Sequence, residues 1–394
     1  MGHFEDSAVN LDILKKRAFN YRWAEVQEGV IPLTAADPDF PVAPQIIKAM
    51  KDYLDGGYLS YTPKLGLPEF REEIAKSLNT RKNEHVNPEW VLPIDSAARG
   101  MYIAAQAVLE PGDEMLIFDP VDYLFGQAAL AAGAKTVLFP AVIKDNKIDL
   151  STLEDYITPK TKMIGLCNPH NPWGTVYTEE DLDHILKIAE KHNIWIMNDE
   201  IWSDIVYSEK PFKSILSLSP ERNKKIISVF GFSKSFGVAG LRIGCIYCHD
   251  QQVFDKIVEV SHVMTTAGGI ASISQIAGIA CLREGYPYVE EFIAHLTKNR
   301  DYAYERLNNM KGISCTKPQA TYLIFPDITK TGLKSQEFAD FMTENAGLAV
   351  VPGTAKFFGP GAEGHIRICF ATSRKILEEG LNRLEKGLSL INKI

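Results

Sequence analysis

Three residues whose side chains can together hold one organic cofactor occur in order along the chain. Lys234 lies between two serines, with a glycine six residues on and an arginine eight residues on. Upstream lie Asn171, in Asn-Pro-His-Asn-Pro-Trp-Gly, and Asp199, in Asn-Asp-Glu-Ile-Trp. A lysine amine can form a Schiff base with an aldehyde, an aspartate can pair with a pyridinium nitrogen, and an asparagine amide can reach a ring hydroxyl. The aldehyde, the pyridinium nitrogen and the ring hydroxyl all belong to pyridoxal phosphate, a cofactor that stabilises carbanions.

The elements that must position these residues alternate between short apolar runs and amphipathic stretches. Strands are predicted over residues 114–118, 136–139, 162–167, 194–197, 226–230 and 243–247, and helices over 124–132 and 178–192. This alternation indicates an α/β fold with a doubly wound, mainly parallel sheet. Asn171, Asp199 and Lys234 each follow the carboxyl end of a predicted strand, which is where such sheets bind ligands.

The pattern changes after about residue 285, where a second region begins. It contains a long predicted helix, short predicted strands and a final amphipathic helix, over residues 289–310, 321–325, 365–370 and 373–391. This mixture is typical of a smaller α+β domain, and the segment before residue 41 is expected to pack with it. The predicted organisation is a large domain over residues 41–285 and a small domain formed by 1–40 and 286–394.

Composition narrows the class of protein. The chain has 394 residues, a net charge of −8, 45% hydrophobic and 23% charged residues, which is typical of a globular protein. The acidic balance argues against nucleic acid or an anionic membrane as a partner. No stretch resembles a signal peptide or a membrane span, so a cytoplasmic location is expected. The six cysteines are scattered rather than spaced as a disulfide framework, and no metal site is expected.

Over nearly its whole length the chain resembles the class I and II pyridoxal-phosphate aminotransferases of fold type I. The resemblance rests on Tyr61-Thr-Pro-Lys-Leu-Gly, Pro111-Gly-Asp-Glu, Asn168-Pro-His-Asn-Pro-Trp-Gly, Asp199-Glu-Ile, Ser233-Lys followed by Gly-Leu-Arg-Ile-Gly, and Arg367. Within that group the chain is similar to the branch that holds the cystathionine β-lyase-like carbon–sulfur lyases. That similarity rests on Ala36-Asp-Pro-Asp-Phe40 and Asp199-Glu-Ile-Trp-Ser-Asp.

The resemblance implies a role for each central residue. Lys234 would hold the cofactor and shuttle a proton, Asp199 would pair with the ring nitrogen, and Asn171 would donate to the ring oxygen. Without the surrounding motifs, Lys234 would be read as a solvated surface lysine, Asp199 as a helix cap and Asn171 as a turn residue.

The resemblance also implies a phosphate site and a substrate site. Arg242 and Ser233 would bind the phosphate with the backbone N–H groups of Ser96, Ala97 and Ala98 at a helix start. Arg99 could bind the phosphate in place of those backbone N–H groups. Tyr61 would reach the phosphate of a neighbouring subunit in a homodimer. Arg367 would bind the substrate carboxylate with help from Asn171, and the small Ala36 would let that carboxylate approach the backbone.

Three positions depart from the family's pattern, and one of them is Gly231, which replaces a common phosphate-binding serine. Trp202 stands where the family usually has a tyrosine whose hydroxyl contacts the ring oxygen, and it offers only an indole N–H. Asp122 stands where the family often stacks an aromatic ring on the cofactor, and Tyr123 follows it. Either Tyr123 supplies the stacking ring through a shifted loop, or that contact is missing.

Three functions are compatible with these residues. The first is an aminotransferase that moves the amino group of an α-amino acid to a 2-oxo acid, and the sequence favours it because of Arg242 and its Gly-Leu-Arg-Ile-Gly setting. The alternative is a carbon–sulfur β-lyase that releases pyruvate, ammonia and a thiol from cystathionine or cysteine. A cofactor-binding regulator without turnover is less favoured, because Lys234, Asp199 and Arg367 are all present. The pattern does not distinguish which amino acid or acceptor is used.

Overall fold

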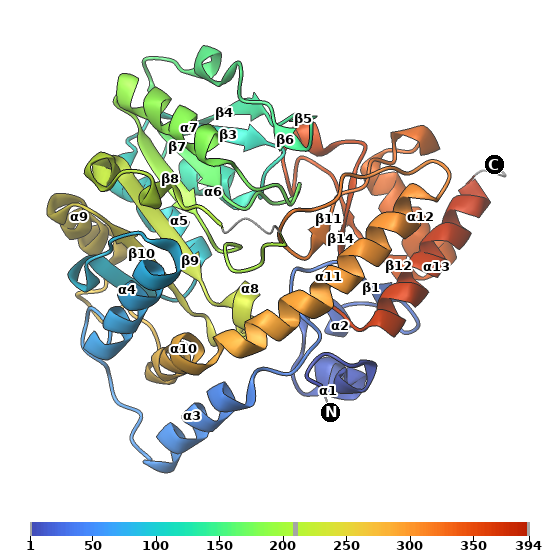
Figure 1. Cartoon of the computed structure of the whole chain (residues 1–394), viewed down its shortest axis with the longest axis horizontal. Helices are drawn as coiled ribbons and strands as arrows, with labels where there is room; N and C mark the ends of the chain where they lie inside the picture. Colours follow the sequence, from blue (N-terminus) through green and yellow to red (C-terminus); the bar gives the residue numbers. More distant parts are fainter. Residues whose placement is uncertain (1, 208–211, 392–394) are drawn as a thin grey trace.

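The computed structural model of the chain describes residues 2–207 and 212–391 (Figure 1). The helices are α1 (Leu11–Lys16), α2 (Tyr21–Ala24), α3 (Pro44–Asp55), α4 (Pro68–Lys82), α5 (Ala97–Val108), α6 (Leu124–Ala131), α7 (Glu179–Lys191), α8 (Ser233–Phe236), α9 (Gln251–Ser261), α10 (Ser272–Glu284), α11 (Tyr286–Asn308), α12 (Ser335–Ala346) and α13 (Arg374–Ile391). The strands are β1 (Ile31–Pro32), β2 (Val91–Ile94), β3 (Glu114–Asp119), β4 (Lys135–Pro140), β5 (Ile143–Lys144), β6 (Lys147–Ile148), β7 (Thr161–Cys167), β8 (Trp195–Asp199), β9 (Ile226–Gly231), β10 (Gly244–Cys248), β11 (Leu323–Ile324), β12 (Leu348–Ala349), β13 (Val351–Pro352) and β14 (Ile366–Cys369).

The largest sheet has seven strands in the order β2-β10-β9-β8-β7-β3-β4. All neighbouring strands are parallel except β10, which runs antiparallel to both β2 and β9. The predicted α/β fold with a mainly parallel sheet is therefore confirmed. The strand predicted over 321–325 is shorter, because Thr321 has a φ of +66°, a left-handed conformation that cannot continue an extended strand.

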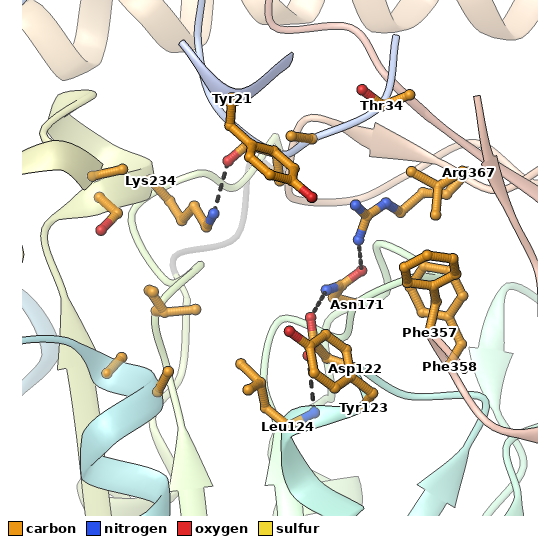
Figure 2. A pocket seen from close by; sticks show the side chains of 18 of the residues that line it. Tyr21, Thr34, Asp122, Tyr123, Leu124, Asn171, Lys234, Phe357, Phe358 and Arg367 are labelled. Atoms are coloured by element: carbon orange, nitrogen blue, oxygen red, sulfur yellow. Dashed lines mark hydrogen bonds between the residues drawn. The ribbon is translucent and has the colours of Figure 1, made fainter. Parts of the chain in front are cut away.

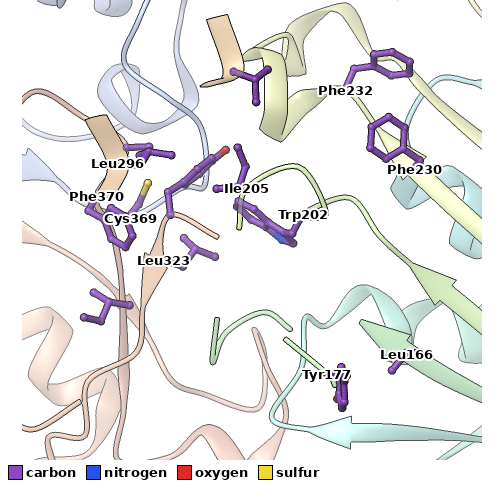
Figure 3. Close-up of a cluster of buried hydrophobic side chains, with 14 of the residues drawn as sticks. Leu166, Tyr177, Trp202, Ile205, Phe230, Phe232, Leu296, Leu323, Cys369 and Phe370 are labelled. Carbon is purple, nitrogen blue, oxygen red and sulfur yellow. The ribbon is translucent and has the colours of Figure 1, made fainter. Parts of the chain in front are cut away.

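Two hydrophobic cores cover the two faces of this sheet. Along β3, Met115 and Ile117 face a core shared with α5, α6 and α9, whereas Leu116 and Phe118 face one shared with α4, α7, α10 and α11. Successive side chains of a strand point to opposite faces, so a strand buried on both sides is apolar throughout. Figure 3 shows part of the second core, with Trp202 and Ile205 on the side that faces the C-terminal region.

The N-terminal segment lies against the C-terminal part of the chain. Strand β1 pairs in parallel with β12, with Ile31 opposite Leu348, and β11, β14 and β13 form a separate antiparallel sheet. In Figure 1 the blue N-terminal elements α2 and β1 lie beside the red helix α13. This pairing agrees with the expected grouping of the two ends, although the domain boundaries themselves stay a prediction. Among the described residues, no helix combines the length and apolar character that crossing a membrane requires.

Candidate active site

A cavity of about 660 Å³ opens at the carboxyl ends of the central strands. It brings together Asn171, Asp199 and Lys234, which follow or end β7, β8 and β9. Those three strands are neighbours in the sheet, so their carboxyl ends share one edge. The remaining predicted site residues that line the cavity are Ala36, Ser96, Ala97, Ala98, Tyr123, Trp202, Ser233, Arg242 and Arg367. Tyr61 does not line it.

Lys234 lies in the first turn of the short helix α8, with its amine directed into the cavity (Figure 2). Its Nζ donates a hydrogen bond to the backbone carbonyl of Ala36 at 2.7 Å. The amine also lies 5.3 Å from the centroid of the Trp202 ring. Burial lowers the pKa of Lys234, because the charged form loses its hydration. A lysine with a lowered pKa is a better nucleophile and base at neutral pH than a surface lysine.

Asp199 is the last residue of β8 and is 7% exposed. Its Oδ1 accepts a hydrogen bond from the backbone N–H of Ile201 at 3.1 Å, and it forms no ion pair with the described residues. Burial raises the pKa of Asp199 to about 7, and the negative charge of Asp122 adds to this effect. A buried carboxylate without a cationic partner is costly, so this position suits a ligand that carries a positive charge.

Part of the cavity wall offers donors for an anion. Helix α5 begins at Ala97, and the Ser96 hydroxyl caps it by accepting from the backbone N–H of Arg99 at 3.1 Å. The free N–H groups of a helix start and its dipole both favour a bound anion. This helix start lies so close to β10 that a Cβ on Gly244 would be 2.6 Å from the Ala97 nitrogen. Ser233 and the exposed Arg242 complete this wall.

Arg367 lies in β14, 9% exposed, and reaches the cavity from the C-terminal region. Its Nη1 donates to the Asn171 Oδ1 at 3.3 Å, whereas its buried Nε has no acceptor among the described residues. Burial lowers the pKa of Arg367, and the negative charge of Asp122 opposes this effect. A buried guanidinium with an unfilled donor fits a carboxylate ligand, which can accept two parallel hydrogen bonds.

The amino-acid sequence and structure of this chain match one large family. The family described as "Aminotransferase class I and II" matches residues 28–384 of this chain. An aspartate aminotransferase from Pyrococcus horikoshii is 35% identical over 368 residues, which cover 93% of this chain and 92% of the relative. The chain belongs to the class I and II aminotransferases.

Three solved structures agree with this assignment. An aromatic aminotransferase from the same organism is 31% identical, with a TM-score of 0.88 over 95% of this chain and 99% of the other. Cystalysin from Treponema denticola, which contains pyridoxal 5'-phosphate, is 24% identical, with a TM-score of 0.90 over 99% of each chain. At that identity the second likeness is one of fold alone. A protein from Clostridium difficile, solved with pyridoxal phosphate bound, is 27% identical, with a TM-score of 0.87 over 95% of this chain and 96% of the other. With the family match, this makes the chain a pyridoxal-phosphate-dependent aminotransferase.

The cavity of this aminotransferase fits pyridoxal phosphate on its own geometry. Its lining includes the N-terminus of α5 with Arg242, which suit a phosphate, and the carboxylate of Asp199, which forms no ion pair among the described residues and suits a ring nitrogen. Lys234, with its lowered pKa, lies in the same cavity. The donor set thus matches an anionic group, a cationic nitrogen and an aldehyde in one molecule.

The structure also shows where two of the departures from the family's pattern, at Trp202 and Asp122, lie, and where Tyr61 lies outside the cavity. Trp202 is buried, and the edge of its ring contacts Tyr322, with the ring centroids 4.6 Å apart. Asp122 and Tyr123 both line the cavity of the aminotransferase, and Tyr123 is 47% exposed. Tyr61 is 93% exposed and lines a separate cavity of about 1040 Å³. The roles of these residues stay predictions.

Sequence reasoning missed several residues around the cavity. Tyr322 donates from its hydroxyl to the Ala36 carbonyl at 3.2 Å, the same oxygen that accepts from Lys234. Tyr21, Phe357 and Phe358 also line the cavity. No local motif marks these residues, because they come from the start of α2 and from loops of the C-terminal region that approach the cavity only in the folded chain.

Proposed function

We propose that Lys234 and Arg367 perform transamination together, with Arg367 fixing the substrate and Lys234 moving a proton at the substrate's Cα. The guanidinium would bind the α-carboxylate of an amino acid and so determine which face of its Cα meets the amine of Lys234. Pyridoxal phosphate, when bound, supplies an electron-withdrawing ring that stabilises the negative charge left on that carbon.

The observation that carries this proposal is the electrostatic arrangement of one cavity. Burial lowers the pKa of Lys234, so a larger fraction of its amine is neutral and able to accept a proton than in a surface lysine. Asp199 has a pKa raised to about 7 and lacks a cationic partner, so its carboxylate favours a protonated ring nitrogen. A base, an electron sink and a carboxylate receptor in one cavity are the components that amino-group transfer requires.

The proposal is tested by separating transfer from elimination. The purified protein loaded with pyridoxal phosphate is incubated with a panel of amino acids and 2-oxoglutarate, and glutamate is measured. In parallel it is incubated with cystathionine alone, and pyruvate is measured. We expect glutamate formation to exceed pyruvate formation. Rapid pyruvate release from cystathionine without glutamate formation would contradict the proposal and support the carbon–sulfur β-lyase.

A matched pair of variants tests the substrate receptor. Arg367→Lys keeps a positive charge but loses the bidentate geometry, so the KM for the amino acid should rise by roughly tenfold or more. Arg374→Lys changes an arginine that stacks on Tyr302 outside the cavity and should leave that KM unchanged. Equal KM values for the two variants would remove Arg367 from the substrate site.

A homodimer with shared sites is part of the proposal. Exposed apolar side chains next to the second cavity support it. They include Tyr58 (82% exposed), Leu59 (67%), Tyr61 (93%) and Met264 (49%). Contiguous apolar surface of this kind is typical of an interface, and a two-fold axis would place the same patch on both subunits. Cytoplasmic location is also proposed, supported by six free thiols that suit a reducing compartment.

A further inference from the structure

Asp122, Asn171 and Arg367 form a chain of hydrogen bonds along one side of the cavity (Figure 2). The Asn171 Nδ2 donates to the Asp122 Oδ2 at 2.9 Å, and the Arg367 Nη1 donates to the Asn171 Oδ1 at 3.3 Å. The second Asp122 oxygen accepts from the backbone N–H of Leu124 at 3.1 Å. Both carboxylate oxygens of Asp122 are therefore engaged.

The chemistry of the two ends determines the orientation of the amide between them. A carboxylate can only accept hydrogen bonds, and a guanidinium can only donate them. The Asn171 amide must therefore turn its nitrogen to Asp122 and its oxygen to Arg367. Reversing the amide would place the Nδ2 donors against the Arg367 donors and the oxygen against the carboxylate, which loses both bonds. Without Asp122, Arg367 would still favour the Asn171 oxygen, but the amide nitrogen would lose the acceptor that holds it from the other side.

The orientation of Asn171 decides which edge of Arg367 is available. Because Nη1 is bonded to Asn171, the edge formed by Nε and Nη2 remains for a ligand, and Nε has no acceptor among the described residues. That edge offers two parallel N–H groups, the geometry that binds a carboxylate bidentately. Arg367 forms no ion pair within the described part of the chain, and Asp122 contributes the largest opposite charge acting on it.

We propose that Asp122 is a positioning residue that holds the amide of Asn171 and, through it, the guanidinium of Arg367 in the orientation that receives a substrate carboxylate. This inference rests on the proposed role of Arg367. It assigns Asp122 a role in substrate binding without direct contact with the substrate. A purely structural alternative is that Asp122 only fixes the start of α6 through its bond to Leu124.

The test compares two ligands of the same shape, the anionic phenylpropanoate and the neutral phenylpropanamide, whose binding to the cofactor-loaded protein is measured by calorimetry. Wild type should bind the carboxylate much more tightly than the amide, which reports on Arg367. Asp122→Ala should reduce that preference by about tenfold, because the guanidinium is no longer held in one orientation. Asp122→Asn should reduce it as well, since its single oxygen cannot replace both carboxylate oxygens, and this isosteric variant serves if the alanine variant does not fold.

The matched control is Asp119→Asn. Asp119 is the last residue of β3, three residues before Asp122, and its carboxylate accepts from the backbone N–H of Gly361 outside the cavity. This substitution should leave the ratio of the two affinities unchanged. If the Asp122 variants weaken both ligands equally, or lower stability without changing the ratio, Asp122 is only a structural residue and the inference is overturned. If wild type itself shows no preference for the carboxylate, the role of Arg367 fails first and this inference fails with it.

Discussion

Replacing Asp199 by asparagine should make the cofactor-free protein less sensitive to pH. Asp199 is buried without a cationic partner, and its pKa is raised from the ordinary 3.8 to about 7. Asparagine has the same shape and can still accept the hydrogen bond from the backbone N–H of Ile201. The substitution therefore removes the ionisation of this side chain while it preserves the packing.

The direction of the pH dependence follows from which state, folded or unfolded, holds the Asp199 proton more tightly. Between pH 3.8 and about pH 7 the folded protein keeps the Asp199 proton and the unfolded chain releases it, so rising pH favours unfolding. This contribution to stability is complete below pH 3.8 and absent above about pH 7. One pH unit corresponds to about 1.4 kcal/mol, so between roughly pH 5.5 and 8.5 wild type should lose about 2 kcal/mol more unfolding free energy than Asp199→Asn.

Urea unfolding of both cofactor-free proteins at these two pH values measures the difference. Asp145→Asn, in the exposed turn between β5 and β6, serves as a matched control and should keep the wild-type pH dependence. Addition of pyridoxal phosphate should stabilise wild type more than Asp199→Asn at alkaline pH, because only the carboxylate gains a cationic partner. Parallel pH dependence in wild type and Asp199→Asn would refute the reasoning about this buried carboxylate.

Further predictions concern the cofactor, the interface and the helix start. Lys234→Ala should abolish turnover but retain some cofactor, measured by the visible absorbance after dialysis, and normal turnover would exclude its assigned role. Tyr61→Phe should weaken cofactor binding by about tenfold, from the loss of one hydrogen bond to a charged group. At a pyridoxal phosphate concentration too low to load Tyr61→Phe, mixing Tyr61→Phe and Lys234→Ala subunits should restore part of the activity, whereas proven exchange without recovery would contradict a shared site. Gly244→Ala should lower the free energy of unfolding by about 1–3 kcal/mol and weaken cofactor binding, because the added Cβ meets the start of α5; an unchanged melting temperature would count against that close approach.

The sequence predicted most of the sheet and part of the site because both depend on local patterns. The apolar runs mark β3, β7, β8 and β9, and the helix predicted from residue 178 is present as α7, with a capping box at Thr178. Such patterns arise from hydrogen bonding and burial within a few residues, so they can be read without knowing the fold. The separate motifs at Asn171, Asp199 and Lys234 were expected to meet because parallel neighbouring strands end at one edge.

Tertiary structure alone decided how the charges in the cavity are paired. Lys234 donates to the carbonyl of Ala36, 198 residues away, and Arg367 donates to Asn171, 196 residues away. The sequence showed Asp122 only as a departure from a family pattern, whereas the folded chain joins it to Asn171. Each of these bonds depends on how loops and strands from both ends of the chain pack over the sheet edge. No periodicity within a segment records that packing, because it is determined by contacts between segments that are distant in the sequence.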